Sequence, residues 1–189
     1  MNQLKRVAVL LAFVLAGIST SAGAAEFRNP ITLAQEYLGL HQEHDRSKLK
    51  DLLDLDPRRI PWCAAFVNKI LELSGYTGTD SLMARSFLSV GDRVRNPRRG
   101  DIVVLTRGSN PASGHVGFYV GEEEGYVLVL GGNQQKGVRI SQYHKSRVLG
   151  YRRLNTVSVN LNSRRAAEVE NCSAQPGTPG FSWTRQCPG

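Results

Sequence analysis

The stretch Pro61-Trp62-Cys63-Ala64-Ala65-Phe66-Val67-Asn68 decides how this sequence folds and where its chemistry lies. Apolar residues recur at helical spacing from Phe66 to Leu73, which predicts a helix that begins near Cys63 and ends before Gly75. A thiol at a helix N-terminus is favoured as thiolate, because unpaired backbone N–H groups and the helix dipole stabilise negative charge. Cys63 is therefore a candidate nucleophile, and its own backbone N–H is a candidate donor to an oxyanion.

Two polar residues further along the chain complete a catalytic pattern. His115 lies at the start of an expected strand in Ser113-Gly114-His115-Val116-Gly117-Phe118, and Asn133 lies in Gly131-Gly132-Asn133-Gln134. A side-chain carbonyl that accepts a hydrogen bond from one imidazole nitrogen fixes the ring, and the other nitrogen can then take the thiol proton. A cysteine, a histidine and a polar third residue, in this order, resemble the pattern of papain-like cysteine enzymes. The chain is therefore predicted to be a cysteine hydrolase or acyltransferase.

The expected hairpin between His115 and Asn133 permits a check of register. If its turn centres on Glu123-Glu124, His115 lies opposite about residue 132, within about one position of Asn133. A slip of one residue would turn Asn133 to the other face, so Asp101 and His144 remain alternatives for the third position. Asp101 is expected to satisfy the N–H groups of a turn, and His144 is expected at the surface.

Helices are expected first along the chain and strands second. The helical patterns lie at 30–38, 52–55, 63–73 and 81–88, and the strand patterns lie at 102–105, 115–120, 126–130, 138–140 and 148–152. This order predicts an α+β fold in which N-terminal helices, with the cysteine at a helix N-terminus, pack on an antiparallel β-sheet.

Residues 1–24 have the pattern of a signal peptide. Lys5 and Arg6 precede an apolar run, and Ala22-Gly23-Ala24 is a small-x-small cleavage pattern. The apolar run is shorter than the roughly 20 residues that span a bilayer, although an uncleaved anchor remains the alternative. We expect a periplasmic or secreted protein without stable membrane insertion after cleavage, with one catalytic domain over 25–154 and a C-terminal tail over 155–189.

Three cysteines in an oxidising compartment leave one unpaired. Pairing Cys172 with Cys187 would staple the tail, contribute on the order of 3 kcal/mol in the chain-entropy model, and leave Cys63 free. The other two pairings remain open. A structural, buried Cys63 is the alternative to a nucleophile.

The formal net charge of +8 would fall to +6 on cleavage after residue 24, because residues 1–24 contain Lys5 and Arg6 but no Asp or Glu. A basic surface predicts attraction to anionic partners. Export argues against nucleic acid and favours cell wall polymers, anionic lipid or acidic proteins, while a basic surface without a specific partner remains the alternative. His41, His44 and His144 do not form a metal-ligand spacing with the cysteines, so no metal site is expected.

Six blocks of sequence together resemble the papain-like cell wall amidases and endopeptidases of the NlpC/P60 and CHAP type, and most of all a bacterial and phage-associated subfamily. The blocks come in the expected order and cover roughly residues 30–153. They are Pro61-Trp62-Cys63-Ala64-Ala65-Phe66-Val67, Ala84-Arg85-Ser86-Phe87-Leu88, Gly100-Asp101-Ile102-Val103-Val104, Gly114-His115-Val116-Gly117-Phe118-Tyr119-Val120, Gly131-Gly132-Asn133-Gln134 and Ser146-Arg147-Val148-Leu149-Gly150-Tyr151-Arg152-Arg153.

The resemblance implies a circularly rearranged papain-like fold and cleavage of amide bonds in peptidoglycan stem peptides, or at their attachment to muramic acid. It implies Cys63 as the nucleophile and His115 as the general base of an enzyme that forms a thioester and needs no metal or organic cofactor. Many NlpC/P60 enzymes place a second histidine third, whereas Asn133 is closer to the CHAP habit.

Other functions remain open from the sequence. The same catalytic residues could serve a protease or acyltransferase with another substrate, because contacts in the groove decide the substrate. A noncatalytic wall-binding or partner-binding module could retain the fold and lack a reactive thiol. A role as an antibacterial toxin would require an immunity or inhibitor protein as partner.

Overall fold

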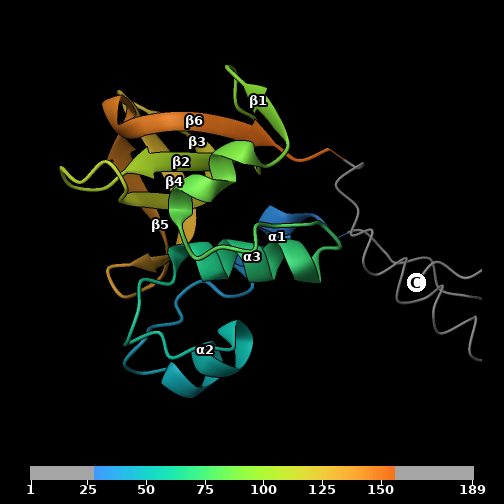
Figure 1. The fold of residues 1–189 in the computed structure, drawn as a ribbon, viewed down its shortest axis with the longest axis vertical. Helices are drawn as coiled ribbons and strands as arrows, with labels where there is room; N and C mark the ends of the chain where they lie inside the picture. Colours follow the sequence, from blue (N-terminus) through green and yellow to red (C-terminus); the bar gives the residue numbers. More distant parts are fainter. Residues whose placement is uncertain (1–27, 156–189) are drawn as a thin grey trace, which may run out of the picture.

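The computed structural model describes residues 28–155, in which helices precede a six-stranded antiparallel sheet (Figure 1). The helices are α1 (Pro30–Gln35), α2 (Arg46–Leu53), α3 (Cys63–Leu73) and the 3₁₀ helices η1 (Ala84–Ser89) and η2 (Lys145–Arg147). The strands are β1 (Asp92–Val94), β2 (Ile102–Thr106), β3 (Gly114–Glu123), β4 (Tyr126–Gln134), β5 (Gly137–His144) and β6 (Val148–Arg153), in the spatial order β1-β6-β2-β3-β4-β5. The predicted α+β class is confirmed.

The helices begin where the sequence supplies caps and apolar periodicity. Asn29 caps α1 by accepting a hydrogen bond from the backbone N–H of Ile31 at 3.2 Å, and Pro30 occupies the first turn. In α3 the side chains from Cys63 to Val67 are all buried, and the chain turns at Gly75, where φ is +81°. Both predicted helices are therefore confirmed, with α1 ending three residues earlier than the pattern extends.

Several elements differ from the sequence prediction: β3, β4 and β5 extend beyond their expected ranges, and η2 was not expected. Helix α2 begins at Arg46, six residues before the expected start, and ends where Asp54 adopts a left-handed φ of +53°. The predicted fourth helix is the 3₁₀ helix η1, and Ser81 accepts a hydrogen bond from Met83 before it begins. Strand β1 was not predicted because its three residues show no apolar alternation; pairing with β6 makes it a strand.

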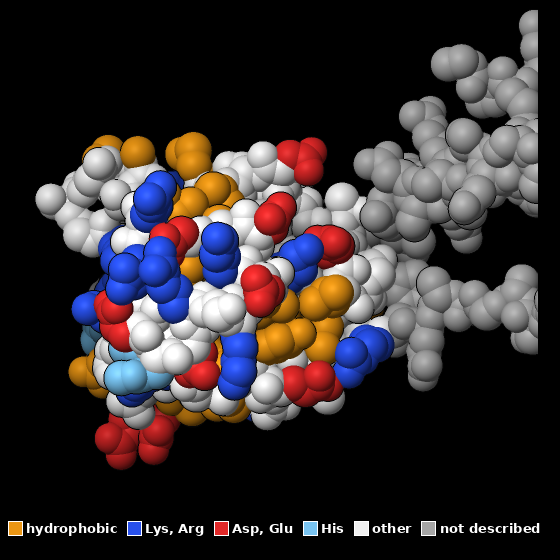
Figure 2. All heavy atoms as spheres, turned by 90° about the horizontal axis from the view of Figure 1, so that it is seen from below, with side chains coloured by type: hydrophobic (Ala, Val, Ile, Leu, Met, Phe, Trp, Pro, Cys, Tyr) orange, Lys and Arg blue, Asp and Glu red, His pale blue; other side chains and the backbone are white. Residues whose placement is uncertain are grey.

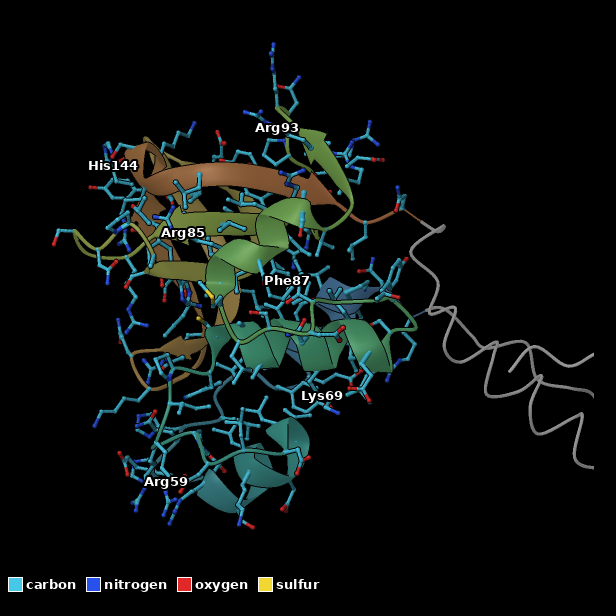
Figure 3. The ribbon with its side chains drawn as sticks, viewed as in Figure 1. Arg59, Lys69, Arg85, Phe87, Arg93 and His144 are labelled. Carbon is cyan, nitrogen blue, oxygen red and sulfur yellow. The ribbon has the colours of Figure 1, made fainter. Side chains whose placement is uncertain are left out.

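The two faces of the sheet carry different cores. On one face α1, α3 and η1 cover the strands, and Phe87 of η1 lies between that helix and α3 (Figure 3). On the other face a smaller cluster forms from Val103, Leu105, Tyr119, Val127 and Val129, with Tyr143, Val148 and Tyr151 packed against it. Direct cross-strand partners share a face, so His115, which pairs with Leu105, belongs to the side of this smaller cluster.

Helix α3 approaches β4 closely because Gly132 has no side chain. A Cβ at this position would lie 2.5 Å from Cζ3 of Trp62 and 2.7 Å from Cβ of Phe66. Trp62 is fully buried, and its indole Nε1 donates to Oε1 of Gln42 at 3.2 Å. Trp62 therefore packs in the core, and the contact holds the N-terminus of α3 against β4.

The hairpin from β3 to β4 turns one residue later than expected. Glu123 pairs with Tyr126, which centres the turn on Glu124-Gly125, and both turn residues have positive φ. Strand β4 then carries a bulge, in which Gly132 and Asn133 together face a single position of β5 between the pairs Gly131–Arg139 and Gln134–Gly137. This bulge decides which polar side chain reaches the histidine.

The signal peptide predicted over 1–24 and the disulfide predicted between Cys172 and Cys187 lie outside the described residues, as does the tail beyond 155. Within residues 28–155 there is no helix of the length and apolarity that a membrane crossing requires.

Candidate active site

Helix α3 places the Cys63 thiol beside the part of β3 that carries His115. The backbone N–H of Val116, the next residue after His115, lies near enough to the Cys63 thiol to lower its pKa, as do the N–H groups of Ala64 and of Cys63 itself. The cysteine is 3% exposed and free of a disulfide. The structure therefore brings together two of the three predicted site residues.

Burial changes the protonation state expected for this thiol. Burial raises the pKa of Cys63, while the three N–H donors and the charge of Arg107 lower it by less. The helix N-terminus thus supplies the N–H groups that the sequence predicted, but removal from water outweighs them. In this closed state Cys63 is a neutral thiol.

His115 is also neutral in this state. The residue is 4% exposed, and burial lowers the pKa of its imidazole from 6.5 to about 4. The side chain of Gln134 acts in the opposite direction and favours the protonated ring, whereas the charges of Arg107 and Arg147 lower the pKa further. An uncharged amide raises a histidine pKa only as an acceptor, so the oxygen end of Gln134 is the end near His115, whose buried Nε2 has no hydrogen-bond partner within residues 28–155.

The orientation of the Gln134 amide is fixed by its other contacts. Its Nε2 donates to the carbonyl oxygens of Val129 and Gly131, each at 3.1 Å, and to that of Arg139. Its Oε1 accepts a hydrogen bond from the Tyr143 hydroxyl at 2.7 Å. Exchanging the nitrogen and the oxygen would place an acceptor against three carbonyl oxygens, so the carbonyl of Gln134 faces the site.

Asn133, the predicted third residue, is half-buried, and its side chain forms no hydrogen bond within residues 28–155. Its φ of +59° places it in the left-handed region at the bulge. Regular alternation from Val129 and Gly131 would have brought Asn133 to the face of His115. The bulge adds one residue, and Gln134 takes that place instead. Two glycines just before a turn are the sequence signal that could have indicated such a bulge.

Tyr143 of β5 packs on the His115 ring, and Arg147 of η2 packs on Tyr143 in turn. The rings of His115 and Tyr143 lie 5.3 Å apart between centroids at an angle of 36°. The guanidinium carbon of Arg147 lies 4.9 Å from the centre of the Tyr143 ring. The guanidinium also donates to the backbone oxygen of Thr106, at 2.8 Å through Nη2. No local sequence pattern marks these residues, because β5 and η2 meet β3 only through the tertiary fold.

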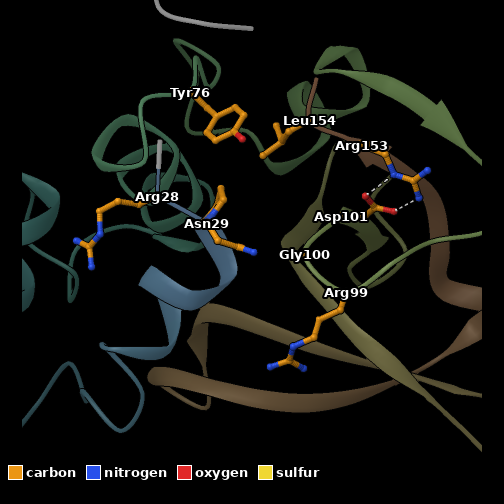
Figure 4. A pocket seen from close by; sticks show the side chains of 9 residues that line it. Arg28, Asn29, Tyr76, Arg99, Gly100, Asp101, Arg153 and Leu154 are labelled. Carbon is orange, nitrogen blue, oxygen red and sulfur yellow. Dashed lines mark hydrogen bonds and ion pairs between the residues drawn. The ribbon is translucent and has the colours of Figure 1, made fainter. Parts of the chain in front are cut away.

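The two alternatives for the third position are engaged elsewhere. Asp101 accepts from Arg153 at 2.7 and 3.0 Å, a contact drawn in Figure 4, and it also accepts from the backbone N–H of Arg98. Its backbone oxygen bonds to Tyr119, so it lies at the opposite end of β2 from Leu105, the partner of His115. His144 is exposed at the end of β5 (Figure 3) and bonds to Ser146. Asp101 thus has the structural role expected for it.

Open hollows in the described surface lie away from the thiol. One of about 280 Å³ lies beside Asp101 and Arg153, and another of about 570 Å³ lies between Thr77 and Gly91. Cys63, His115 and Gln134 line neither of them. Because all three side chains are also almost fully buried, the candidate site is closed in this conformation and must open to admit a substrate.

Charges on the α2 side of the molecule largely neutralise one another. Figure 2, which shows this side, has Lys and Arg side chains interspersed with Asp and Glu. The ion pairs there include Arg46–Asp56 and Arg58–Glu43. Within residues 28–155 no group of three or more His, Cys, Asp or Glu side chains could hold a metal ion.

The fold and this site define a papain-like α+β domain with a cysteine on a helix and a histidine on the sheet. Residues 55–133 match the family model of the CHAP domain, a segment that contains Cys63, His115 and Asn133 and ends one residue before Gln134. This part of the chain is therefore similar to the CHAP family. None of the curated proteins compared with the chain matches it. CHAP domains are generally hydrolases of peptidoglycan, so the match indicates a peptidoglycan hydrolase or amidase.

Proposed function

We propose that this protein is an exported cysteine amidase or endopeptidase that cleaves amide bonds of peptidoglycan stem peptides through a thioester. The observation that carries the proposal is the position of Cys63. Its thiol lies at the N-terminus of α3, near backbone N–H groups that favour its charged form, one of them on the residue after His115. The CHAP match over 55–133 supports peptidoglycan as the substrate.

The reaction begins with two neutral groups. His115 takes the proton of Cys63 as the sulfur attacks the carbonyl carbon of the scissile amide, and the electron pair of the C=O bond moves onto the oxygen. The backbone N–H of Cys63 is the oxyanion donor that the site offers. When the tetrahedral intermediate collapses, the C–N bond breaks and His115 gives its proton to the leaving amine. A thioester remains on Cys63.

Water completes the cycle. His115 takes a proton from a water molecule, whose oxygen attacks the thioester carbonyl. The C–S bond breaks, the sulfur recovers a proton, and the acyl group leaves as a carboxylic acid. Burial keeps both groups neutral in the closed state, so in this proposal the proton moves to His115 only after the site opens to substrate, as the sulfur attacks.

For the third role we propose Gln134 in place of Asn133. A carbonyl that accepts from one imidazole nitrogen during the reaction stabilises the imidazolium and keeps the ring oriented. The Gln134 carbonyl is directed to His115 by the four other hydrogen bonds of the amide. Asn133 has no comparable support.

The test is digestion of purified peptidoglycan sacculi by the purified protein and by the Cys63→Ala variant. Soluble fragments analysed by mass spectrometry should appear only with the unmodified protein, and their masses identify the bond. Empty digests from both proteins, with both proteins bound to the sacculi, would instead indicate a noncatalytic wall-binding module. Fragments produced equally by the variant would remove Cys63 from the mechanism.

Export rests on the sequence of residues 1–24, and we propose a periplasmic or secreted location on that basis. N-terminal sequencing of the protein recovered outside the cytoplasm should begin at Ala25. A protein recovered only from the cytoplasm, and beginning at Met1, would contradict export.

A further inference from the structure

Tyr143 contacts both members of the pair formed by His115 and Gln134. Its ring packs on the His115 ring with 5.3 Å between centroids. Its hydroxyl donates to Oε1 of Gln134 at 2.7 Å.

Tyr143 is itself held on its other side. Arg147 lies over the Tyr143 ring at 4.9 Å and is anchored by two hydrogen bonds to the backbone oxygen of Thr106, at 2.8 and 3.3 Å. Thr106 follows Leu105, the cross-strand partner of His115. Tyr143 therefore packs on the His115 ring, and Arg147 connects Tyr143 to the backbone of Thr106, next to the cross-strand partner of His115.

The Tyr143 hydroxyl holds the oxygen end of the Gln134 amide in place. The three carbonyl oxygens hold the nitrogen end of the Gln134 amide, while Tyr143 is the group hydrogen-bonded to its oxygen end. Burial raises the pKa of Tyr143 to about 12, so the hydroxyl remains protonated and can donate at neutral pH. A fixed Oε1 then presents the same lone pair to His115 through each turnover.

We propose that Tyr143 is a positioning residue, which holds the Gln134 carbonyl against His115 through its hydroxyl and limits rotation of the imidazole through its ring, with Arg147 bracing it. This inference rests on the proposed function only for its kinetic consequences. Its structural part, a single fixed tautomer of His115, stands independently of the substrate.

The kinetic test compares Tyr143→Phe with Tyr126→Phe. Tyr126 is a matched control, because its ring also packs on a histidine, His144, at 5.5 Å, but lies far from Cys63 along β4. Loss of one orienting hydrogen bond should lower kcat by about tenfold in Tyr143→Phe with KM unchanged, and Tyr126→Phe should match the unmodified protein. Equal kcat in all three proteins would overturn the proposal.

A double-variant cycle tests whether Tyr143 acts through Gln134. On a Gln134→Ala background, adding Tyr143→Phe should produce no further fall in kcat, since the hydroxyl then has no oxygen to hold. If the two substitutions lower kcat by factors that multiply in full, Tyr143 acts by another route and the proposal is overturned.

A measurement without substrate separates the two hypotheses. Imidazole ¹⁵N spectra of His115 should show one tautomer in the unmodified protein and a mixture in Tyr143→Phe, with a smaller change of the same kind in Arg147→Gln. If this change appears while sacculi are not cleaved, the proposed function fails and the positioning role stands. If sacculi are cleaved and the spectra of all variants coincide, the positioning role fails and the proposed function stands.

Discussion

Cys63 and His115 illustrate how burial can oppose the local electrostatics of a site. Both residues are almost inaccessible to water, and burial disfavours the charged form of each, raising the pKa of the thiol and lowering that of the imidazole. The N–H groups at the start of α3 and the Gln134 carbonyl favour the charged forms. In the proposed reaction, these N–H groups and this carbonyl stabilise the charge that develops on the reacting groups. Such an arrangement is expected to stabilise a transition state rather than the ground state.

A chemical consequence at the residue scale concerns alkylation of Cys63. Because burial raises the pKa of this thiol, its reaction with iodoacetamide should be slow at pH 7 and should accelerate only above the pH at which an ordinary cysteine ionises. The measurement is the pH profile of alkylation, followed on the Cys63 peptide by mass spectrometry so that Cys172 and Cys187 do not interfere. Half-maximal alkylation at neutral or lower pH would contradict a neutral thiol.

The neighbouring residues Asn133 and Gln134 are expected to respond differently to substitution. Gln134→Ala removes the carbonyl that orients His115 and should lower kcat by roughly 10- to 100-fold, toward the range seen for lost acid–base function. Asn133→Gly preserves a left-handed backbone and should leave kcat within about twofold. Steady-state kinetics below the melting temperature of both variants decides between them. A larger loss in Asn133→Gly would return the third role to Asn133.

At the scale of elements, the site depends on the contact between α3 and β4. Gly132 lets the helix approach the strand, and the bulge that contains Gly132 and Asn133 turns Gln134 inward. Gly132 and Asn133 thus set both the distance between α3 and β4 and which polar side chain of β4 faces His115.

Substitution of Gly132 should therefore damage packing directly. A Cβ at Gly132 would clash with Trp62 and Phe66, both fully buried, and Gly132→Ala should lower the free energy of unfolding by about 1–3 kcal/mol. Gly121 is the control, because a Cβ there meets nothing within 4 Å and its φ is not in the left-handed region. Urea unfolding of Gly132→Ala and Gly121→Ala measures the difference. Equal stabilities would show that α3 can move away from β4 at little cost.

At the scale of the whole molecule, a buried neutral histidine couples folding to pH. The pKa of His115 is about 4 in the folded protein and 6.5 when the residue is exposed, so the unfolded chain binds a proton more readily between these values. The contribution to stability is fully present above pH 6.5 and is lost as the pH falls through 4. At about 1.4 kcal/mol per pKa unit, the loss reaches on the order of 3 kcal/mol.

This coupling predicts a measurable change in the free energy of unfolding between pH 7 and pH 4.5. The unmodified protein should lose stability over that interval, and His115→Gln should lose clearly less, because it lacks the group that takes up the proton. Urea unfolding at the two pH values provides the comparison. Parallel losses in the two proteins would indicate that His115 is not buried in its neutral form.

Much of the fold follows from local pattern. The apolar spacing after Cys63, the cap at Asn29 and the alternating segments of the sheet each belong to one element, and residues a few positions apart determine them. The order of Cys63, His115 and Asn133 along the chain also indicated the region of the candidate site. The short strand β1 escaped prediction because only its partner β6 makes it a strand.

The sequence by itself determined the α+β class, the position of Cys63 at a helix N-terminus and the strand that carries His115. Only the tertiary structure decided that Gln134 rather than Asn133 faces the histidine, and that Tyr143 and Arg147 enclose it. The physical reason is the difference between local and distant interactions. Helix periodicity and caps act within a few residues, whereas a one-residue bulge and contacts between β3 and β5 depend on how separate strands pair and pack.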